Sequence, residues 1–552
     1  MNSETRQCEN CKNSFVIEPD DFSFYEKMNV PAPMWCPDCR QRRRVSFRNF
    51  KTLYKRPSSK SGQSLVSMYS QKVPFPVWSI KEWWQDDWDA RGFGRDLDLS
   101  KPFLEQFLEL SKVVPHYCIH NIKSNDCEYS NAVLQSKNCY YIFGCVSSEQ
   151  SAYGHIVWNS RECFDNLYVF KSELCYECID VLNSYRLLYS RECEDCADGI
   201  GLFDCRGCTN CIGCVGLRQK TYYIFNEPVG EVAYKKFLTD HPLNDSKNID
   251  LILERTEELK RNVPQRYFYG SHNNDVSGNH IYNAKNVHYS FDVKSGENSK
   301  FVFTARSAVD SYDISFVADT EESYENLTCA GQRSFFCHLN FNSNDAFYSE
   351  HCYGCHDIFG CEGLKSAEYC ILNKQYPKEE YLLLKEKLIE HMKETGEWGE
   401  FFPIVMSPFA YNESIVNEYY PLTKEEATRL GYRWEDDVPR TSNLETIKSA
   451  DLPKDPRAYS ESLLKEVMKC DQCGHNYRFI LSEINFYKQS GLALPIKCFN
   501  CRHERRMRER NPRMLWAGNC AKCGVAFQTS YDAEKQKRYK IYCEQCYQGE
   551  VV

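Results

Sequence analysis

A period of twelve residues runs through positions 124–214 and constrains the fold more than any other feature of the chain. Each repeat of such a short, constant period cannot bury its own apolar face and must stack on its neighbours. Twelve residues are too few for a pair of helices, and the stretch is rich in residues that favour strands. The period therefore predicts a β-solenoid, in which one repeat is either a whole narrow coil or half of a wider one. The residues that keep the period are Ser124, Ser136, Ser148, Ser160, Ser172, Ser184, Cys196 and Cys208.

The same unit occurs a second time further along the chain. Residues 205–217 are matched 147 positions later by residues 352–364. An amphipathic segment follows each copy, at 231–238 and 378–393, and we expect both to be helices that cover the open strand edges. The predicted fold is therefore mainly β, with two tandem β-solenoids and helical caps. Counting back from Cys355 in steps of twelve gives Ser343, Gly331, Asp319, Ser307 and Ser295.

Paired cysteines near both ends of the chain have the spacing of metal-binding knuckles. Two CxxC pairs are separated by 24 residues at each end, and a third set has 19 residues between its pairs. Four thiolates from two such pairs close a tetrahedron around Zn²⁺, which supplies much of the folding energy of a small domain. We predict three structural Zn²⁺ sites rather than Fe–S clusters. The predicted ligands are Cys8, Cys11, Cys36 and Cys39; Cys470, Cys473, Cys498 and Cys501; and Cys520, Cys523, Cys543 and Cys546.

Residues 53–94 have the pattern of a zinc ribbon that has lost its ligands. The segment aligns with the third cysteine set so that Ser58 and Ser61 stand where Cys520 and Cys523 stand. Serine is a poor zinc ligand, so we expect no metal there. In its place we expect aromatic packing by Tyr54, Trp78, Trp83, Trp84 and Trp88.

Arginines follow the second CxxC pair of both terminal ribbons. One interpretation is a phosphate-binding arm, with Phe47 and Phe50 available to stack on unpaired bases. The other is that the arginines neutralise the negative charge of a four-thiolate zinc centre. The interleaved aromatic residues favour nucleic acid, and RNA before DNA, because no recognition helix of a duplex reader is visible. The arginines concerned are Arg40, Arg42, Arg43, Arg44, Arg48, Arg502, Arg505, Arg506, Arg508 and Arg510.

Four cysteines of the first repeat region, Cys205, Cys208, Cys211 and Cys214, have the spacing of a ferredoxin-type cluster loop. The second copy has Ile358 in place of Cys211, and the run keeps the twelve-residue period. Free cysteine is also among the most buried residue types. We therefore expect a stacked structural ladder, with a metal or redox site as the alternative.

The motifs divide the chain into nine parts. A helix is predicted within 95–115, with Ser100 as its N-cap and Pro102 in its first turn, and we expect it to close the front of the first solenoid. The predicted parts are zinc ribbon 1 (1–52), a degenerate ribbon (53–94), the helix with solenoid 1 (95–226), a helical cap and connector (227–265), solenoid 2 (266–373), a capping helix (374–396), an ordered segment with a linker (397–468), zinc ribbon 2 (469–513) and zinc ribbon 3 (514–552).

Composition limits the compartment and the kinds of partner. The chain has 552 residues, 31 cysteines and a net charge of −9. Its first residues carry no apolar leader, and no run approaches the ~18 apolar residues of a membrane span. We expect a cytoplasmic protein without membrane contact, whose cysteines are reduced and either buried or metal-bound. The oligomeric state stays open.

Motifs of common enzymes are not found in the sequence. There is no phosphate loop, no nucleotide fingerprint and no Ser/His/Asp order. His116, His120, His155 and His272 lack HxxxH or HExxH spacing, so we expect structural or surface roles for them. No catalytic residue is predicted.

Both terminal ribbons share one pattern: a CxxC pair, an acidic residue before Phe-Tyr, and then Pro-x-x-Cys-x-x-Cys-Arg. This pattern resembles the probable treble-clef zinc-ribbon family. Taken whole, the chain resembles a group of cysteine-rich proteins of ultra-small, reduced-genome bacteria, and the resemblance extends over nearly its full length, including the tracts 83–89 and 401–403. The resemblance implies zinc and the order of the domains, and it implies no activity.

Three functions follow as hypotheses. The leading one is a non-enzymatic zinc protein whose basic ribbons bind nucleic acid, with RNA or the ribosome favoured, while the solenoids form a rigid body. The second is a scaffold for another protein, in which the arginines only screen zinc thiolates. The third is a metal or redox protein that uses the cysteines from Cys205 to Cys214.

Overall fold

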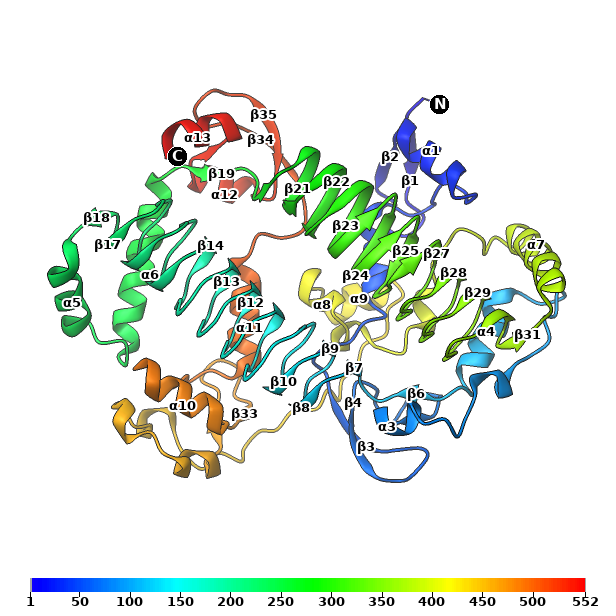
Figure 1. The fold of residues 1–552 in the computed structure, drawn as a ribbon, viewed down its shortest axis with the longest axis horizontal. Helices are drawn as coiled ribbons and strands as arrows, with labels where there is room; N and C mark the ends of the chain where they lie inside the picture. The colour runs from blue at the N-terminus through cyan, green and yellow to red at the C-terminus, as the bar shows by residue number, and fades with distance from the viewer. Residues whose placement is uncertain (1, 552) are drawn as a thin grey trace. The chain divides into compact units, whose positions relative to one another are not determined.

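The computed structural model describes residues 2–551, and the chain forms two compact units, each assembled from separate stretches (Figure 1). Unit 1 comprises Met1–Ile119, Phe268–Asp437 and Arg513–Leu515. Unit 2 comprises His120–Tyr267, Val438–Pro512 and Trp516–Val552. We call the three cysteine-bearing parts module 1 (1–52), module 2 (469–513) and module 3 (514–552). Module 1 therefore belongs with the second repeat region, and modules 2 and 3 fall almost entirely in the unit of the first.

Unit 2 contains the first ladder, residues 121–224, in which short strands pair in parallel. Leu167 pairs with Ile179, and Ile179 pairs with Arg191, so that partners lie twelve residues apart. Isolated bridges with the same spacing continue the pairing between strands. The period found in the sequence is thus the period of strand pairing. The strands are β7 (Asn121–Ile122), β8 (Asn125–Glu128), β9 (Val133–Leu134), β10 (Lys137–Tyr140), β11 (His155–Trp158), β12 (Leu167–Phe170), β13 (Ile179–Leu182), β14 (Arg191–Glu194), β15 (Ala197–Ile200), β16 (Thr209–Ile212) and β17 (Thr221–Ile224).

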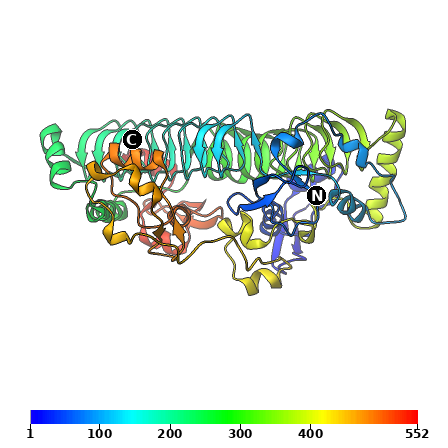
Figure 2. The ribbon, with the colours of Figure 1, turned by 90° about the horizontal axis from the view of Figure 1, so that it is seen from below.

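The first ladder has a narrow interior. From Lys123 to Phe225 every third residue has a positive φ, so each twelve-residue turn of the chain has four corners. Figure 2 shows these turns stacked side by side. Residues that directly follow a corner are mostly buried along the ladder, and most of the side chains in this space are small, with Ile142, Leu187 and Leu202 as larger members. This geometry explains why cysteine is so frequent in the sequence. The buried cysteines of the first ladder are Cys139, Cys145, Cys163, Cys175, Cys178, Cys193, Cys196, Cys205, Cys208, Cys211 and Cys214.

Large apolar side chains lie on the outside of the same ladder and are covered by other elements. Phe486 of module 2 stacks on Phe164, with ring centroids 4.5 Å apart. Ile252 of helix α6 (Ser246–Asn262) belongs to the same buried cluster. The core of unit 2 therefore includes the interface between the ladder and the elements around it. The covered column consists of Phe164, Tyr176, Leu188, Ile200, Ile212 and Ile224.

Unit 1 contains the second ladder, whose period is interrupted. Most of its partners also lie twelve residues apart, but Gly270 pairs with Ile281 and Thr320 pairs with Gly331, each only eleven residues on. The count in twelves from Cys355 is therefore wrong by one position at Asp319 and at the earlier Ser307 and Ser295, since Gly331 pairs with Thr320 and Thr320 with Ala308. The strands are β20 (Gly270–Ser271), β21 (Asn274–Tyr282), β22 (Ala284–Val293), β23 (Gly296–Val309), β24 (Tyr312–Glu321), β25 (Tyr324–Leu327), β26 (Gly331–Gln332), β27 (Ser334–Phe335), β28 (Asn344–Phe347), β29 (His356–Phe359) and β30 (Glu368–Ile371).

Both predicted capping helices are present. Helix α5 (Gly230–Asp240) packs on β17, and the edge of β17 pairs with the antiparallel strand β18 (Glu227–Pro228). Helix α7 (Lys378–Glu394) packs on β30, which pairs in the same way with β31 (Lys374–Gln375). The last strand of each ladder is thus closed to edge-to-edge pairing.

The predicted helix near residue 100 forms, but it lies on the other ladder. Helix α4 (Phe103–Ser111) has Pro102 as its N-cap, because the Ser100 hydroxyl donates to Asp98 at 2.6 Å instead. Phe103 packs edge-on against Phe359 of the second ladder, at 5.1 Å between ring centroids. The expectation that this helix closes the first solenoid is therefore wrong.

The remaining elements belong to the modules and their connections. In the part of the chain that the structure describes, no helix is long and apolar enough to cross a membrane. In unit 1 these elements are β1 (Glu4–Gln7), β2 (Ser14–Ile17), α1 (Pro19–Lys27), α2 (Pro37–Val45), β3 (Tyr54–Pro57), β4 (Ser64–Ser67), β5 (Val77–Trp78), α3 (Ile80–Trp83), η1 (Ala90–Phe93), β6 (His116–Tyr117), η2 (Ile404–Met406), η3 (Tyr411–Glu413), α8 (Val416–Tyr419) and α9 (Lys424–Arg429). In unit 2 they are β19 (Gln265–Arg266), η4 (Ser449–Asp451), η5 (Pro456–Ala458), η6 (Glu461–Lys465), β32 (Met468–Lys469), β33 (Asn476–Tyr477), α10 (Leu481–Ser490), α11 (Phe499–Glu509), β34 (Trp516–Asn519), β35 (Ala526–Thr529), α12 (Ala533–Arg538), β36 (Ile541–Tyr542) and α13 (Glu544–Val551).

The eleven-residue turn at Gly331 gives a test of the second ladder. Gly331 has a φ of 145°, and a Cβ there would lie 1.9 Å from the carbonyl oxygen of Ser343. We expect Gly331→Ala to lower the free energy of unfolding by at least about 2 kcal/mol, measured by urea denaturation. Gly396→Ala is the control, because a Cβ there meets nothing within 4 Å. Its cost should be about 1 kcal/mol, that of the left-handed backbone alone. Equal losses in the two variants would contradict the close approach.

Candidate metal centres

The first centre lies in module 1, where a hairpin and a helix each supply one cysteine pair. Cys8 and Cys11 lie in the turn between β1 and β2, Cys36 is the N-cap of α2, and Cys39 lies in the first turn of that helix. The Sγ atoms of Cys11 and Cys36 are 3.8 Å apart. A tetrahedron with metal–sulfur bonds of about 2.3 Å has edges of about 3.8 Å. The four sulfurs therefore fit a single ion.

Modules 2 and 3 repeat this geometry. Cys473 Sγ lies 3.7 Å from Cys498 Sγ in module 2, and Cys523 Sγ lies 3.7 Å from Cys543 Sγ in module 3. In each of the three groups all ligand atoms lie within 4.8 Å of one another, so each group is able to hold a metal ion. The predicted ligands are thus brought together as three sets: Cys8, Cys11, Cys36 and Cys39; Cys470, Cys473, Cys498 and Cys501; and Cys520, Cys523, Cys543 and Cys546.

Backbone amides favour the thiolate form at one position of each centre. Burial raises the pKa of Cys8, but amide donors such as Cys36 N, 3.2 Å from its Sγ, outweigh this and bring the pKa to about 7. The same balance between burial and amide donors sets the pKa of Cys470 at about 7 and that of Cys520 at about 6. Since metal binding requires deprotonated sulfur, these amides prepare the centres for a cation.

Residues 53–94 hold one hydrogen-bonded carboxylate, Glu82, beside Ser58, which stands where the aligned module has a cysteine. Ser58 Oγ donates to Glu82 Oε2 at 2.7 Å, and the Ser79 amide donates to the same oxygen at 2.8 Å. The predicted aromatic packing accompanies it: Trp83 is fully buried and lies edge-on to Trp88, although Trp84 is 40% exposed. Hydrogen bonds and ring packing therefore hold this segment together.

The carboxylate of Glu82 predicts a pH dependence. Burial raises its pKa, but hydrogen bonds from Ser61, Ser58 and Ser79 outweigh this and lower the pKa from 4.5 to about 2. A carboxyl with a lowered folded pKa stabilises the fold above its unfolded pKa and loses that contribution as the pH falls. Glu82→Gln should therefore destabilise unit 1 at pH 7, and the difference from wild type should shrink between pH 4.5 and pH 2. Urea denaturation at several pH values measures it, and a constant difference would contradict the assignment.

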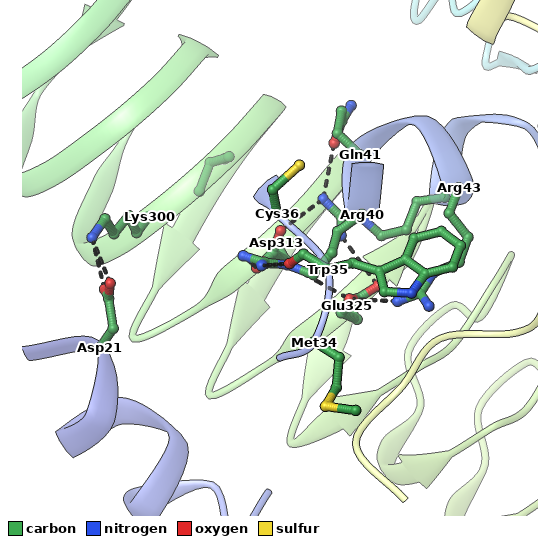
Figure 3. Close-up of polar contacts among 12 residues, drawn as sticks. Asp21, Met34, Trp35, Cys36, Arg40, Gln41, Arg43, Lys300, Asp313 and Glu325 are labelled. Atoms are coloured by element: carbon green, nitrogen blue, oxygen red, sulfur yellow. Dashed lines mark hydrogen bonds and ion pairs between the residues drawn. The ribbon is translucent and has the colours of Figure 1, made fainter. Parts of the chain in front are cut away.

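Arg40 and Arg43 of module 1 point toward acids of the second ladder (Figure 3). Arg40 donates to Asp313 from Nε at 3.1 Å and from Nη2 at 2.7 Å. Arg43 pairs with Glu325 at 2.9 Å, and Arg44 lies 3.1 Å from Asp313 and 3.2 Å from Glu325. These five side chains are at most 4% exposed. We call this group the clamp of unit 1.

A matching clamp joins module 2 to the first ladder in unit 2. Arg502 and Arg506 each donate to Asp165 at 3.0 Å. Arg506 and Arg505 each reach Glu177 at 2.6 Å. Both acids are almost completely buried and therefore lack contact with water. As in the clamp of unit 1, ion pairs with the arginines compensate for that lost hydration.

The two clamps are built from corresponding residues. Asp313 and Glu325 stand 148 positions after Asp165 and Glu177, and within each pair the acids are twelve residues apart. The aromatic contacts beside them correspond as well. Phe24 stacks on Tyr312 with ring centroids 3.8 Å apart, as Phe486 stacks on Phe164. The mode of docking is therefore duplicated together with the ladders and modules.

Most of the arginines assigned to a phosphate-binding arm are buried, and ladder carboxylates draw all of these except Arg48 inward. Arg510 follows the same rule and pairs with Asp180 at 2.8 Å. Arg42 and Arg505 are partly buried, and Arg508 is exposed. The buried members are Arg40, Arg43, Arg44, Arg48, Arg502, Arg506 and Arg510.

The clamp of unit 1 gives a stability test. Asp313→Asn removes the acid from two buried arginines and should lower the free energy of unfolding by about 3–5 kcal/mol in urea denaturation. Asp345→Asn is the control, since Asp345 pairs with Arg333 at 2.7 Å on the surface, where side chains are 26% and 49% exposed. A surface pair contributes about 1 kcal/mol or less. Similar losses in both variants would mean that the clamp contributes no more than a surface pair.

The cysteines from Cys205 to Cys214 line the interior of the first ladder. Cys205 Sγ contacts the carbonyl oxygen of Phe203 at 3.5 Å and that of Cys214, on the next turn, at 3.4 Å. Serine hydroxyls elsewhere in the ladder make the same contacts; Ser148 Oγ reaches the carbonyl of Val157 at 2.8 Å. Cysteine and serine therefore do the same thing in the ladder: both are small side chains that contact carbonyl oxygens of their own turn and the next. This is the stacked structural ladder that was expected from the sequence.

The acids of the clamps were not singled out in the sequence. Asp165, Glu177, Asp313 and Glu325 are ordinary charged residues in stretches of mixed composition. A usable signal exists, because each pair repeats the twelve-residue period and both pairs recur at one offset, 148 positions, within one residue of the 147 positions that separate the matched repeat units. Two acids at one phase of a stacked repeat lie side by side on adjacent turns and attract basic side chains.

No protein-family model matches the chain, and no curated protein matches it.

Proposed function

We propose that the protein is a non-enzymatic zinc-binding scaffold for a protein partner. In this proposal each ladder is a β-solenoid with one twelve-residue repeat per coil, and the modules are treble-clef zinc ribbons that fasten onto it. The observation that carries the proposal is the pair of buried clamps, because the arginines that would have bound a polyanion serve to join ribbon to solenoid. Burial removes most of the arginines on which the hypothesis of RNA or ribosome binding depended.

Zinc is the ion we assign to the three cysteine centres. Sulfur–sulfur distances of 3.7–3.8 Å match the edges of a tetrahedron around one ion, whereas a cluster of several irons holds its thiolates further apart. Four-thiolate sites that lack an open position are typical of structural zinc. We assign no redox role to Cys205 and its neighbours, since their sulfurs contact backbone carbonyls within the ladder.

A partner surface is available on the first ladder. A shallow hollow of ≈ 560 Å³ there is lined by polar residues of successive turns, including Glu149, Arg161, Lys171 and Glu173. Arg161 lies 3.4 Å from Glu173, with both side chains largely exposed. Acidic and basic groups alternate along this face, so a protein with a complementary mixed pattern fits it better than a uniformly charged nucleic acid.

Metal analysis of the purified full-length protein tests the zinc ribbons. We expect zinc in each cysteine centre and no iron. Cys523→Ser should lose one equivalent and destabilise module 3, because the site supplies folding energy to a module with little core. Cys145→Ser is the matched control, since Cys145 is equally a cysteine but lies inside the ladder. Iron in the wild type, or the same metal content in Cys523→Ser as in wild type, would contradict the assignment.

Site-specific crosslinking tests the partner. A photo-crosslinking amino acid at Lys171, in the hollow, should capture a defined protein after nuclease treatment. The same amino acid at Val232, which is 84% exposed on helix α5, should not. Crosslinked nucleic acid at Lys171, or retention of RNA at ~50 mM salt that is lost as salt rises, would restore the nucleic-acid hypothesis instead.

A further inference from the structure

A buried group of two histidines and a glutamate lies in unit 1, outside the three cysteine centres. Strand β6 supplies His116, and the second ladder supplies His351 and Glu362 from successive turns. The three residues are 3%, 2% and 1% exposed. They come from separate stretches of the chain, which is why spacing in the sequence gave no sign of them.

The ligand atoms of this group converge on one point. His351 Nδ1 lies 2.8 Å from Glu362 Oε1, and His116 Nε2 lies 3.8 Å from the same oxygen. One ligand atom from each residue lies within 4.8 Å of the other two, the same bound that holds for the cysteine centres. The Tyr69 hydroxyl lies 3.4 Å from His351 Nε2, so the outer nitrogen of that ring has a partner and the inner nitrogen faces the carboxylate.

Some polar atoms of this group lack a hydrogen-bond partner within the protein. Among the described residues, Glu362 Oε2 and His116 Nδ1 have no hydrogen-bond partner. Glu350, one turn away on the ladder, adds a second acid nearby and pairs with His338 at 3.3 Å. A buried carboxylate whose neighbours are imidazoles and another acid lacks a fixed positive charge.

We infer that His116, His351 and Glu362 hold a fourth metal ion, a divalent first-row transition ion of the zinc class. Two imidazoles and a carboxylate are a donor set that such ions prefer, and a dication supplies the charge that the carboxylate lacks. The second oxygen of Glu362 is free to complete the coordination. The alternative to a metal ion is a set of hydrogen bonds within the protein. In that state a proton is shared between His351 and Glu362, and His116 Nε2 donates to the carbonyl oxygen of Ser111 at 3.3 Å.

X-ray absorption on the full-length protein tests the site without any substitution. Three cysteine centres alone give a first shell of sulfur only, whatever their occupancy. The proposed site adds an ion with nitrogen and oxygen neighbours, so that roughly a quarter of the metal ions have such a shell when all four sites are filled. A pure sulfur shell would overturn the inference and leave the zinc ribbons untouched, while a shell without sulfur would instead contradict the ribbons.

Substitution locates the site. Glu362→Gln should lose one metal equivalent relative to wild type and remove the nitrogen and oxygen signal. Glu350→Gln should retain both, since Glu350 occupies the same column one turn earlier and pairs with a different histidine. If Glu362→Gln does not fold, His116→Gln replaces it in the same comparison. If a folded Glu362→Gln or His116→Gln variant holds as much metal as the wild type, the assignment is refuted.

Discussion

The narrowness of a twelve-residue turn governs the rest of this structure. A corner at every third residue leaves room inside the ladder for cysteine, serine and valine but little for larger side chains. The bulky residues that usually build a core therefore stand on the outside, as Phe164 and Tyr176 do, and something else must cover them. The modules provide that cover, and they are themselves too small to form a large core. Each part thus compensates for what the other lacks.

Charge complements this packing at the clamps. Burying several arginines is unfavourable unless each meets an acid with good geometry, and both clamps supply such acids from adjacent turns. Apolar contacts alone would tolerate sliding along a repetitive surface, since one turn resembles the next. The carboxylates occur at defined turns only, so they select the turns on which the module docks. This is a role in specificity in addition to any contribution to stability.

Much of this arrangement could be predicted from the sequence, and the reasons for the failures are physical. The period of Ser124 and its successors gave the pairing distance because stacked repeats must keep one length, and CxxC spacing gave the centres because one ion needs four nearby sulfurs. The direction in which the Arg40 side chain points could not be predicted. The local sequence around an arginine is the same whether its side chain faces water or a distant acid. The partner of Arg40 is 273 residues away. The histidines were set aside because spacing finds ligands only when one segment supplies several of them.

The separation of Arg40 from Asp313 has a consequence for synthesis of the chain. A ribosome that adds 5–20 residues per second needs roughly 15 to 55 s to cover that interval. During this time module 1 exists without its acceptor, while the first ladder, which carries a similar pair of acids at Asp165 and Glu177, emerges ahead of the second. The order of synthesis thus presents the acids of the first ladder to module 1 before those of its own partner, so correct docking requires that any such early contact be reversible.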